Sequence, residues 1–298
     1  MKPAWSVILL TTLIGAGQGL FLVVFAAVLF RSPPREFVLL CGCAVLGLLA
    51  AGLFASFFHL GRPWRAWRAV TQWRTSWLSR EVIVLPAFMG CVFAFLISGS
   101  FLIGALASLL CIALFLCTGM IYACLRFVQE WASFLTPVNF ALLGLASGAT
   151  LAVPLAALAW PPSAAPLALA AGALGAVAWL ARGAALVRNA RLRPKSSVAT
   201  AIGVTGARIA QISQGFTGGS YNTREFLARR PGARLALARA LFVVLFFPLP
   251  AWLLGWGGGA LAVLWAACAL QFAGLLAERW TFFAEARHPQ NLYYQAKA

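Results

Sequence analysis

Eight long apolar stretches constrain this chain more than any other feature of its sequence. A helix needs about 20 apolar residues to cross about 30 Å of hydrocarbon, and polar or turn-forming residues divide the chain accordingly. The expected spans are 4–30, 37–59, 82–100, 101–125, 138–160, 165–187, 236–256 and 259–280. Only 10% of the 298 residues are charged, against about a quarter in soluble proteins. The sequence therefore predicts an all-α integral membrane protein, with about eight transmembrane helices in two four-helix bundles and a single transmembrane domain over 1–298.

The basic residues lie almost entirely on one side of the expected membrane. The net charge is +17, and of 23 Lys and Arg residues only Arg31 and Arg35 fall in connections on the opposite side. An excess of Lys and Arg is typical of cytoplasmic loops. The sequence therefore predicts a multi-pass protein of the bacterial inner membrane, with both termini and the long loops in the cytoplasm. A basic surface that docks an acidic partner would give the same distribution.

Two connections on the basic side carry most of the polar residues. In the 60–81 connection, Arg62, Arg65 and Arg68 recur at helical spacing with tryptophans between them. This pattern predicts a short interfacial helix between the second and third spans. The 188–234 loop is long and basic, and loops of this length are usually functional or disordered. Binding of a partner or of anionic lipid would suit it.

His59 and Glu81 close the facing ends of the second and third spans, so a short connection brings both to the same membrane face. Reduction or oxidation of a quinone moves two protons with two electrons, and an imidazole and a carboxylate can exchange those protons near neutral pH. We therefore predict that His59 and Glu81 are the catalytic pair of a quinone site. A structural role for the histidine and an ion pair between the glutamate and an arginine are the alternatives.

Few other polar residues lie inside the spans. Gln18 sits in a run of small residues and is a candidate second contact to quinone. Interhelical hydrogen bonds are expected for Asn139, Thr150 and Gln271, and helix-end pairing for Glu278 and Arg279. No span carries a charge near its middle, which disfavours proton pumping and ion-coupled transport.

The histidine and cysteine patterns argue against a metal or haem in this chain. A haem with two histidine ligands needs a pair inside the spans, whereas the chain has only His59 and His288. The seven cysteines form no C-x2-C cluster of the kind that holds zinc or iron–sulfur centres. We expect no metal site and no haem here, and no nucleic-acid partner.

The string HLGRPWRAWRA followed by SWLSRE resembles the membrane-anchor subunits of dimethyl sulfoxide reductase type enzymes, a group that includes polysulfide and nitrite reductase membrane subunits. The resemblance extends across the chain, with eight spans and a Gly-Gln pair early in the first. The His and Glu that this family uses for menaquinol match His59 and Glu81, and its arginine matches Arg65. The quinone-binding set expected from the motif and its neighbours is His59, Arg65, Trp77, Ser79, Glu81 and Gln18. The expected partner-docking residues are Arg62, Arg68, Arg74 and Arg80.

A longer string, FHLGRPWRAWRAVTQWRTSWLSRE with the ending ERWTFFAEARHPQNLYY, is more similar to anchors of cytoplasmic sulfite dehydrogenases. This resemblance implies a complex of three chains, in which a molybdenum-cofactor catalytic subunit and a ferredoxin-like subunit with four [4Fe-4S] clusters dock on the anchor. It also implies haem-free electron transfer to ubiquinone or menaquinone. A cytoplasmic basic face favours quinone reduction during sulfite oxidation. The alternative is a dimethyl sulfoxide reductase type anchor that oxidises menaquinol.

Two further hypotheses belong to other functional classes. A small-solute or ion transporter with an eight-helix core would need broken helices or buried charges around a midplane site, and neither is visible in the sequence. A passive anchor would only tether its partners. Copurification of a molybdenum- and iron-containing partner would separate the electron-transfer hypothesis from the transporter.

Overall fold

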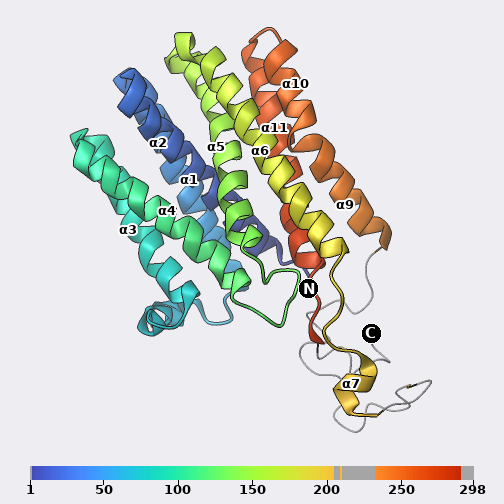
Figure 1. Ribbon diagram of the computed structural model, residues 1–298. Coiled ribbons are helices and arrows are strands. Elements are labelled where there is room, and N and C mark those ends of the chain that lie inside the picture. The colour runs from blue at the N-terminus through green and yellow to red at the C-terminus, as the bar shows by residue number, and fades with distance from the viewer. Residues whose placement is uncertain (1, 205–208, 210–231, 290–298) are drawn as a thin grey trace.

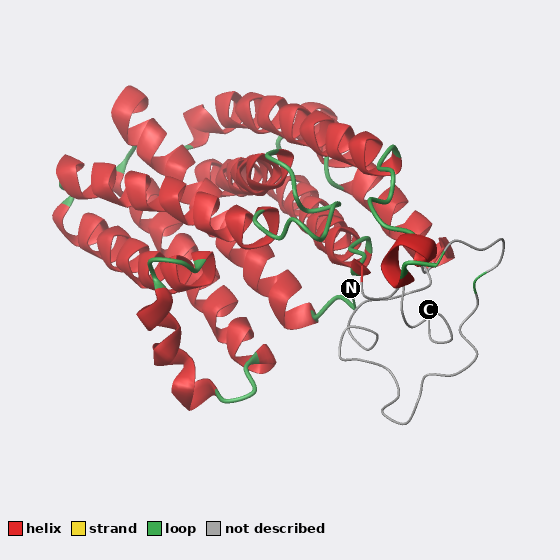
Figure 2. Cartoon of the chain, turned by 60° about the horizontal axis from the view of Figure 1, so that its bottom comes forward, coloured by secondary structure: helices red, strands yellow, loops and turns green. Residues whose placement is uncertain are grey.

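In the computed structural model, which describes residues 2–204, 209 and 232–289, every regular element is a helix (Figure 2). Within these residues, eight helical segments are long and apolar enough to cross a membrane, as predicted. They are α1 (Trp5–Arg31), α2 (Arg35–Ser56), α3 (Trp77–Ser98), α4 (Phe101–Ala123), α5 (Leu135–Ala159), α6 (Ala164–Ala190), the pair α9 (Gly232–Leu245) and α10 (Pro248–Trp256), and α11 (Leu261–Ala284). Shorter helices are η1 (Phe57–His59), η2 (Pro63–Gln72), η3 (Pro161–Ser163) and α7 (Val198–Ile202). The predicted short helix between the second and third spans is η2, a 3₁₀ helix.

The spanning helices fall into two groups along the chain, and α1 and α5 join the groups (Figure 1). Glycines bring these two helices into backbone contact. A Cβ atom added to Gly19 would lie 2.0 Å from the carbonyl oxygen of Gly144, and one added to Gly148 would lie 2.0 Å from the backbone nitrogen of Leu20. Small residues at such positions let membrane helices approach closely. The backbones of α1 and α5 are therefore in direct contact at Gly19 and Gly148, with no room for a side chain between them.

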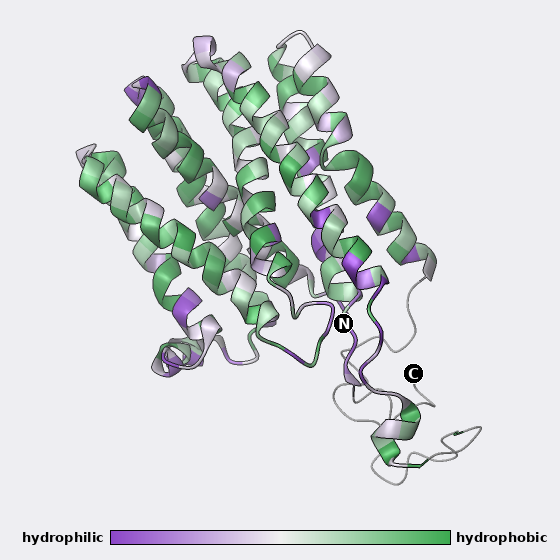
Figure 3. Ribbon diagram, viewed as in Figure 1, coloured by the Kyte–Doolittle hydropathy of each residue, from purple (hydrophilic) through white to green (hydrophobic). Residues whose placement is uncertain are grey.

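The polar segments gather at one end of the molecule. Hydrophilic residues concentrate at the end where α1 begins, while the helices are mostly hydrophobic along their length (Figure 3). The connections at the opposite end are short, at 32–34, 99–100, 160–163 and 257–260. We call the end that contains η2 and the start of α1 the basic end. Much of the predicted 188–234 loop, at 205–208 and 210–231, lies outside the described residues.

The seventh span is broken, whereas the sequence predicted one continuous helix over 236–256. α9 and α10 meet at a break because Pro250 lacks the N–H that would bond the carbonyl of Phe246 in a continuous helix. Two side chains from neighbouring helices replace the lost backbone donors. Gln271 Nε2 donates to the Phe246 carbonyl at 3.1 Å, and Trp179 Nε1 donates to the Val243 carbonyl at 3.1 Å. These bonds satisfy carbonyls that lipid cannot.

Candidate functional site

The start of α3 determines where Glu81 lies. Ser76 caps the helix by accepting a hydrogen bond from the backbone N–H of Ser79 at 3.3 Å, as is common for serine at this position. The helix therefore begins at Trp77, before the predicted start at residue 82. As a result Glu81 belongs to the second turn of a spanning helix. It points into the bundle instead of lying in the interfacial connection.

Glu81 is buried and accepts a hydrogen bond from a threonine. Only 8% of the residue is exposed, and Thr118 Oγ1 on α4 donates to its Oε1 at 2.5 Å. A buried carboxylate is costly unless it is paired or hydrogen-bonded. Among the described residues its hydrogen-bond partner is Thr118, and no arginine lies within ion-pair distance of it. The ion pair considered from the sequence is therefore not observed.

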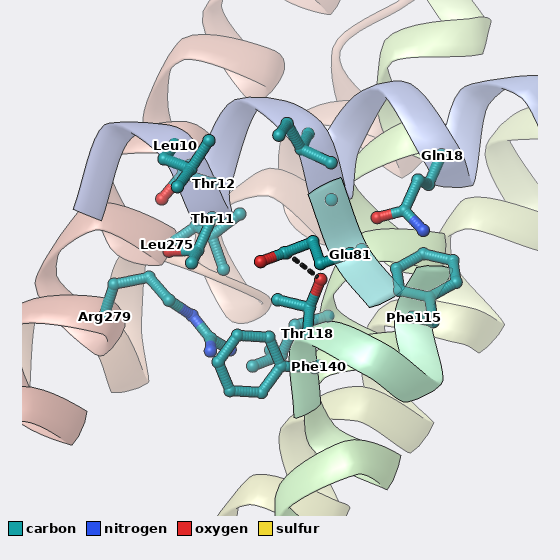
Figure 4. A pocket seen from close by; sticks show the side chains of 14 residues that line it. Leu10, Thr11, Thr12, Gln18, Glu81, Phe115, Thr118, Phe140, Leu275 and Arg279 are labelled. Carbon is teal, nitrogen blue, oxygen red and sulfur yellow. Dashed lines mark hydrogen bonds between the residues drawn. The ribbon is translucent and has the colours of Figure 1, made fainter. Parts of the chain in front are cut away.

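A cavity of about 10 Å³, which we call the Glu81 cavity, lies between α1, α3, α4, α5 and α11 (Figure 4). Its apolar wall includes Phe115 and Phe140. Its polar lining consists of Thr11, Thr12, Gln18, Glu81, Thr118 and Arg279. The volume holds about one water molecule. Five helices thus converge to present hydroxyl, amide, carboxylate and guanidinium groups to one oxygen-sized space.

Gln18 reaches this cavity from α1. It is 1% exposed, and its Nε2 donates to the backbone carbonyl of Cys111 on α4 at 3.0 Å. The Cys111 thiol in turn donates to the backbone carbonyl of Gln18 at 3.4 Å. This reciprocal pair fixes the amide at the cavity wall. Of the residues predicted to bind quinone, the structure thus brings Gln18 and Glu81 together.

The other predicted quinone residues lie elsewhere. His59 is exposed at the end of η1, and Arg65 is exposed on η2. Trp77 is stacked under Arg80, whose guanidinium carbon is 4.3 Å from the ring centroid. Ser79 is buried but does not line the Glu81 cavity. The predicted site therefore divides into a buried part around Glu81 and a surface part at η1 and η2.

The predicted docking arginines also differ among themselves. Arg62, Arg68 and Arg74 are exposed on or beside η2. Arg80 instead bonds within its own segment, with Nε donating to the Trp73 carbonyl at 2.9 Å and Nη2 to the Arg74 carbonyl at 2.8 Å. Its guanidinium therefore stabilises the turn that leads into α3. The other three arginines present their charge at the surface.

A buried ionic cluster lies close to the Glu81 cavity, and sequence reasoning missed it. Glu278 on α11 pairs with Arg182 on α6 at 2.5 Å and with Arg279 at 2.7 Å. All three residues are at most 3% exposed. The expectation of helix-end pairing for Glu278 and Arg279 overlooked Arg182 and the depth of the cluster, roughly two turns inside α6 and α11.

The buried cluster and the broken seventh span correct one expectation. The sequence showed neither buried charges nor broken helices around a midplane site, which weighed against a transporter. The described residues contain a broken span, and a buried charge cluster that lies about two turns inside the ends of α6 and α11. A detectable signal existed in the sequence. Arg182, Glu278 and Arg279 interrupt otherwise apolar windows, and Pro248 and Pro250 lie within the seventh.

A second cavity of about 10 Å³, the Glu130 cavity, lies on the other side of this cluster. Its polar lining consists of Glu130, Ser133, Thr136, Asn139, Arg182, Arg188, Asn189, Glu278 and Arg279. Arg279 and Phe140 border both cavities. Burial raises the pKa of Glu130, and the nearby charge of Arg287, at 3.4 Å, opposes that rise. The Glu130 cavity adjoins the connection between α4 and α5 at the basic end.

Comparison with known proteins agrees with this architecture. The family model described as the DMSO reductase anchor subunit (DmsC) matches residues 1–285. The chain is 48% identical to a sulfite dehydrogenase subunit of Allochromatium vinosum over 327 aligned positions, which cover all of both chains. Such a match over the whole length includes the spans, the η2 connection and the helices around Glu81. The chain therefore belongs to the family of DMSO reductase anchor subunits, the membrane subunits of molybdoenzyme complexes.

Proposed function

We propose that this chain is the quinone-reactive membrane subunit of a complex that oxidises sulfite in the cytoplasm and passes the electrons to quinone. In this proposal a four-cluster iron–sulfur subunit docks on the basic end and carries electrons from a molybdenum catalytic subunit. The observation that carries the proposal is the position of Glu81, a buried carboxylate facing an oxygen-sized polar cavity in the half of the bundle near the basic end. The similarity to the sulfite dehydrogenase protein of Allochromatium vinosum supports sulfite as the electron source.

The lining of the Glu81 cavity suits a quinone carbonyl. Quinone oxygens are hydrogen-bond acceptors. Gln18 has a second N–H besides the one that it donates to Cys111, and Arg279 Nη1 has no partner among the described residues, whereas the single O–H of Thr118 is already donated to Glu81. The volume accommodates one oxygen-sized atom but not a ring. A carbonyl oxygen is therefore the part of the headgroup that this cavity can receive. The ring needs space outside it.

The proton chemistry falls to Glu81 and His59. Quinone, when bound, accepts two electrons and two protons. Glu81 holds or releases a proton at its carboxylate, and Thr118 keeps that carboxylate oriented by donating to Oε1. His59, exposed at the end of η1, exchanges protons with water at the surface. The two residues thus act at different depths, one inside the bundle and one at its basic end.

Exposed arginines provide the docking surface. Arg62, Arg68 and Arg74 surround three exposed tryptophans on and after η2. A cationic surface of this kind attracts an acidic partner and orients its approach. Docking here would bring the last cluster of an iron–sulfur subunit close to the connection that leads into α3.

The test uses the assembled complex in membranes. Glu81→Gln and His59→Ala should each reduce quinone-linked sulfite turnover, by at least about a hundredfold for the glutamate. Turnover with a soluble redox dye should stay normal, because the catalytic subunit is untouched. Glu36→Gln serves as the control, since Glu36 is a carboxylate in the first turn of α2 at the opposite end. Normal quinone turnover in Glu81→Gln would show that Glu81 is not part of the quinone site. If added quinol reduces the iron–sulfur subunit but sulfite does not reduce quinone, electrons flow in the opposite direction to the one proposed.

A further inference from the structure

Four charged residues are buried within the described part of the chain: Glu81, Arg182, Glu278 and Arg279. Arg182, Glu278 and Arg279 are joined by ion pairs and together carry one net positive charge. Buried charge is costly unless an opposite charge compensates it. The fourth residue, Glu81, provides a balancing negative charge when it is ionised. The ionic cluster and the Glu81 cavity therefore form one electrostatic unit, joined through Arg279.

Of the three residues in the ionic cluster, Arg279 is the one that lines both cavities. Its Nε pairs with Glu278, and its guanidinium carbon lies 4.0 Å from the centroid of the Phe140 ring. The contact with the carboxylate and the aromatic ring fixes the plane of the guanidinium. Its Nη1, although buried, has no hydrogen-bond partner among the described residues. Arg182 Nη2 has none either, but of the two arginines Arg279 is the one that lines the Glu81 cavity. Figure 4 shows the side chain reaching from α11 towards the side of the cavity where Glu81 and Thr118 lie.

A buried N–H without an acceptor is unfavourable, so a donor held rigidly at a cavity wall indicates an acceptor from outside the chain. The acceptor must be about the size of one oxygen atom, because the cavity has no more room. A water molecule fits this space, and so does a carbonyl oxygen, which also gains from the nearby positive charge of the cluster. A quinone carbonyl oxygen meets these conditions, since negative charge develops on it as electrons arrive.

We propose that Arg279 is a further quinone-binding residue, which donates from Nη1 to the carbonyl oxygen of the headgroup and stabilises the charge that develops there. This inference rests on the proposed function. The quinone gains two electrons from the iron–sulfur subunit and two protons, while Arg279 keeps its own proton throughout. Donors fixed in advance at the position of developing charge are the most effective kind, because they need not reorganise. Glu278 is the positioning residue for Arg279.

Arg182 offers a matched control. It is as deeply buried as Arg279 and pairs with the same carboxylate, but it lines only the Glu130 cavity of the two. Arg182→Gln and Arg279→Gln therefore remove the same charge from the same cluster. Only the second removes a donor from the Glu81 cavity.

The experiment measures binding of a short-chain ubiquinone to the purified complex, by quenching of tryptophan fluorescence, alongside quinone-linked and dye-linked turnover. Arg279→Gln should weaken binding at least tenfold and raise the KM for quinone, with dye-linked turnover unchanged. Arg182→Gln should alter binding less than twofold. Equal weakening in both variants, or unchanged binding in Arg279→Gln, would show that the cluster is only structural.

A second variant covers the case in which Arg279→Gln does not assemble. Arg279→Lys keeps the charge, but its single nitrogen cannot occupy both the Nε position beside Glu278 and the separate Nη1 position that is proposed to donate into the cavity. Binding at least threefold weaker is expected, and unchanged binding contradicts the inference. Glu81→Gln separates the two proposals. If it abolishes quinone turnover while both Arg279 variants bind quinone normally, the proposed function stands and the role of Arg279 falls.

Discussion

At the scale of single residues, the contact between Thr118 and Glu81 is the most informative. Thr118 comes from a largely apolar helix, and its hydroxyl is the donor that the buried carboxylate uses. A hydrogen bond to a charged group contributes about 1.5–3 kcal/mol. Loss of this bond should therefore be felt directly in the chemistry that Glu81 performs.

Thr118→Val tests this contact. The valine keeps the shape of the side chain but cannot donate, so Glu81 loses its orientation, and quinone-linked turnover should fall by about tenfold or more. Thr150→Val is the control, because Thr150 is also buried and its hydroxyl bonds to the backbone of its own helix. An equal loss of quinone turnover in the two variants would mean that the effect comes from removing a buried hydroxyl in general and not from the bond between Thr118 and Glu81. Steady-state kinetics with quinone and with dye measures the difference.

The sequence predicted part of this site and missed the rest for a physical reason. Glu81 stood out because it ends the connection opposite His59 and matches the family motif, and Gln18 because an amide is rare in an apolar span; both line the same cavity. Thr118 gave no signal, since threonine bonds to its own helix in most spans. Arg279 looked like a helix-end charge. Only the packing of α11 against α1 and α5 shows that it borders the Glu81 cavity.

At the scale of helices, close packing between α1 and α5 depends on residues without side chains. Gly148→Ala should be strongly destabilising, because the added methyl group would overlap the backbone of α1 near Leu20. Overpacking of this kind costs about 1–3 kcal/mol. Gly172→Ala on α6 is the control, since nothing lies within 4 Å of its added Cβ. Thermal unfolding in detergent should show a lower Tm for the first variant and no loss for the second.

The break between α9 and α10 allows a second test at this scale. Gln271→Leu leaves the Phe246 carbonyl without its donor, which should lower stability by about 1–3 kcal/mol. Pro250→Ala restores a backbone N–H at the position that would bond this carbonyl in a continuous helix. In the double variant the penalty of Gln271→Leu should therefore shrink. Purely additive effects would indicate that the side-chain bond does not replace the missing backbone bond.

Helix existence was predictable, but several helix ends were not. Hydropathy located all eight spans because a bilayer demands long apolar runs. α3 begins at Trp77 and not at the predicted residue 82, because the helix start is set by the cap at Ser76 and not by the first residue of the apolar run. Pro248 and Pro250 were visible in the seventh span, yet their effect depends on Gln271 and Trp179, which the fold brings from distant parts of the chain.

At the scale of the whole molecule, the polar segments share one end, while its orientation in the membrane is still a prediction. A green fluorescent protein fused to the C-terminus should fluoresce, and alkaline phosphatase inserted between Gly99 and Ser100 should be active. Both results are expected because Lys and Arg concentrate on the side of the termini, which predicts that this side is cytoplasmic and that the 99–100 connection is on the other side of the membrane. The opposite pattern of reporter activity would place the basic end, and any partner docked there, outside the cytoplasm.

The backbone contact between α1 and α5 also bears on how far electrons travel. Electron tunnelling slows steeply with each added ångström, so a redox protein gains from keeping its distances constant. Gln18 on α1 and Phe140 on α5 both line the Glu81 cavity, and Gly19 and Gly148 let the two helices pack backbone to backbone, so that separating them would cost these contacts. A transporter that worked by rocking its two halves would have to break such contacts. Here the same seam would hold the acceptor at one fixed tunnelling distance from whatever docks at the basic end.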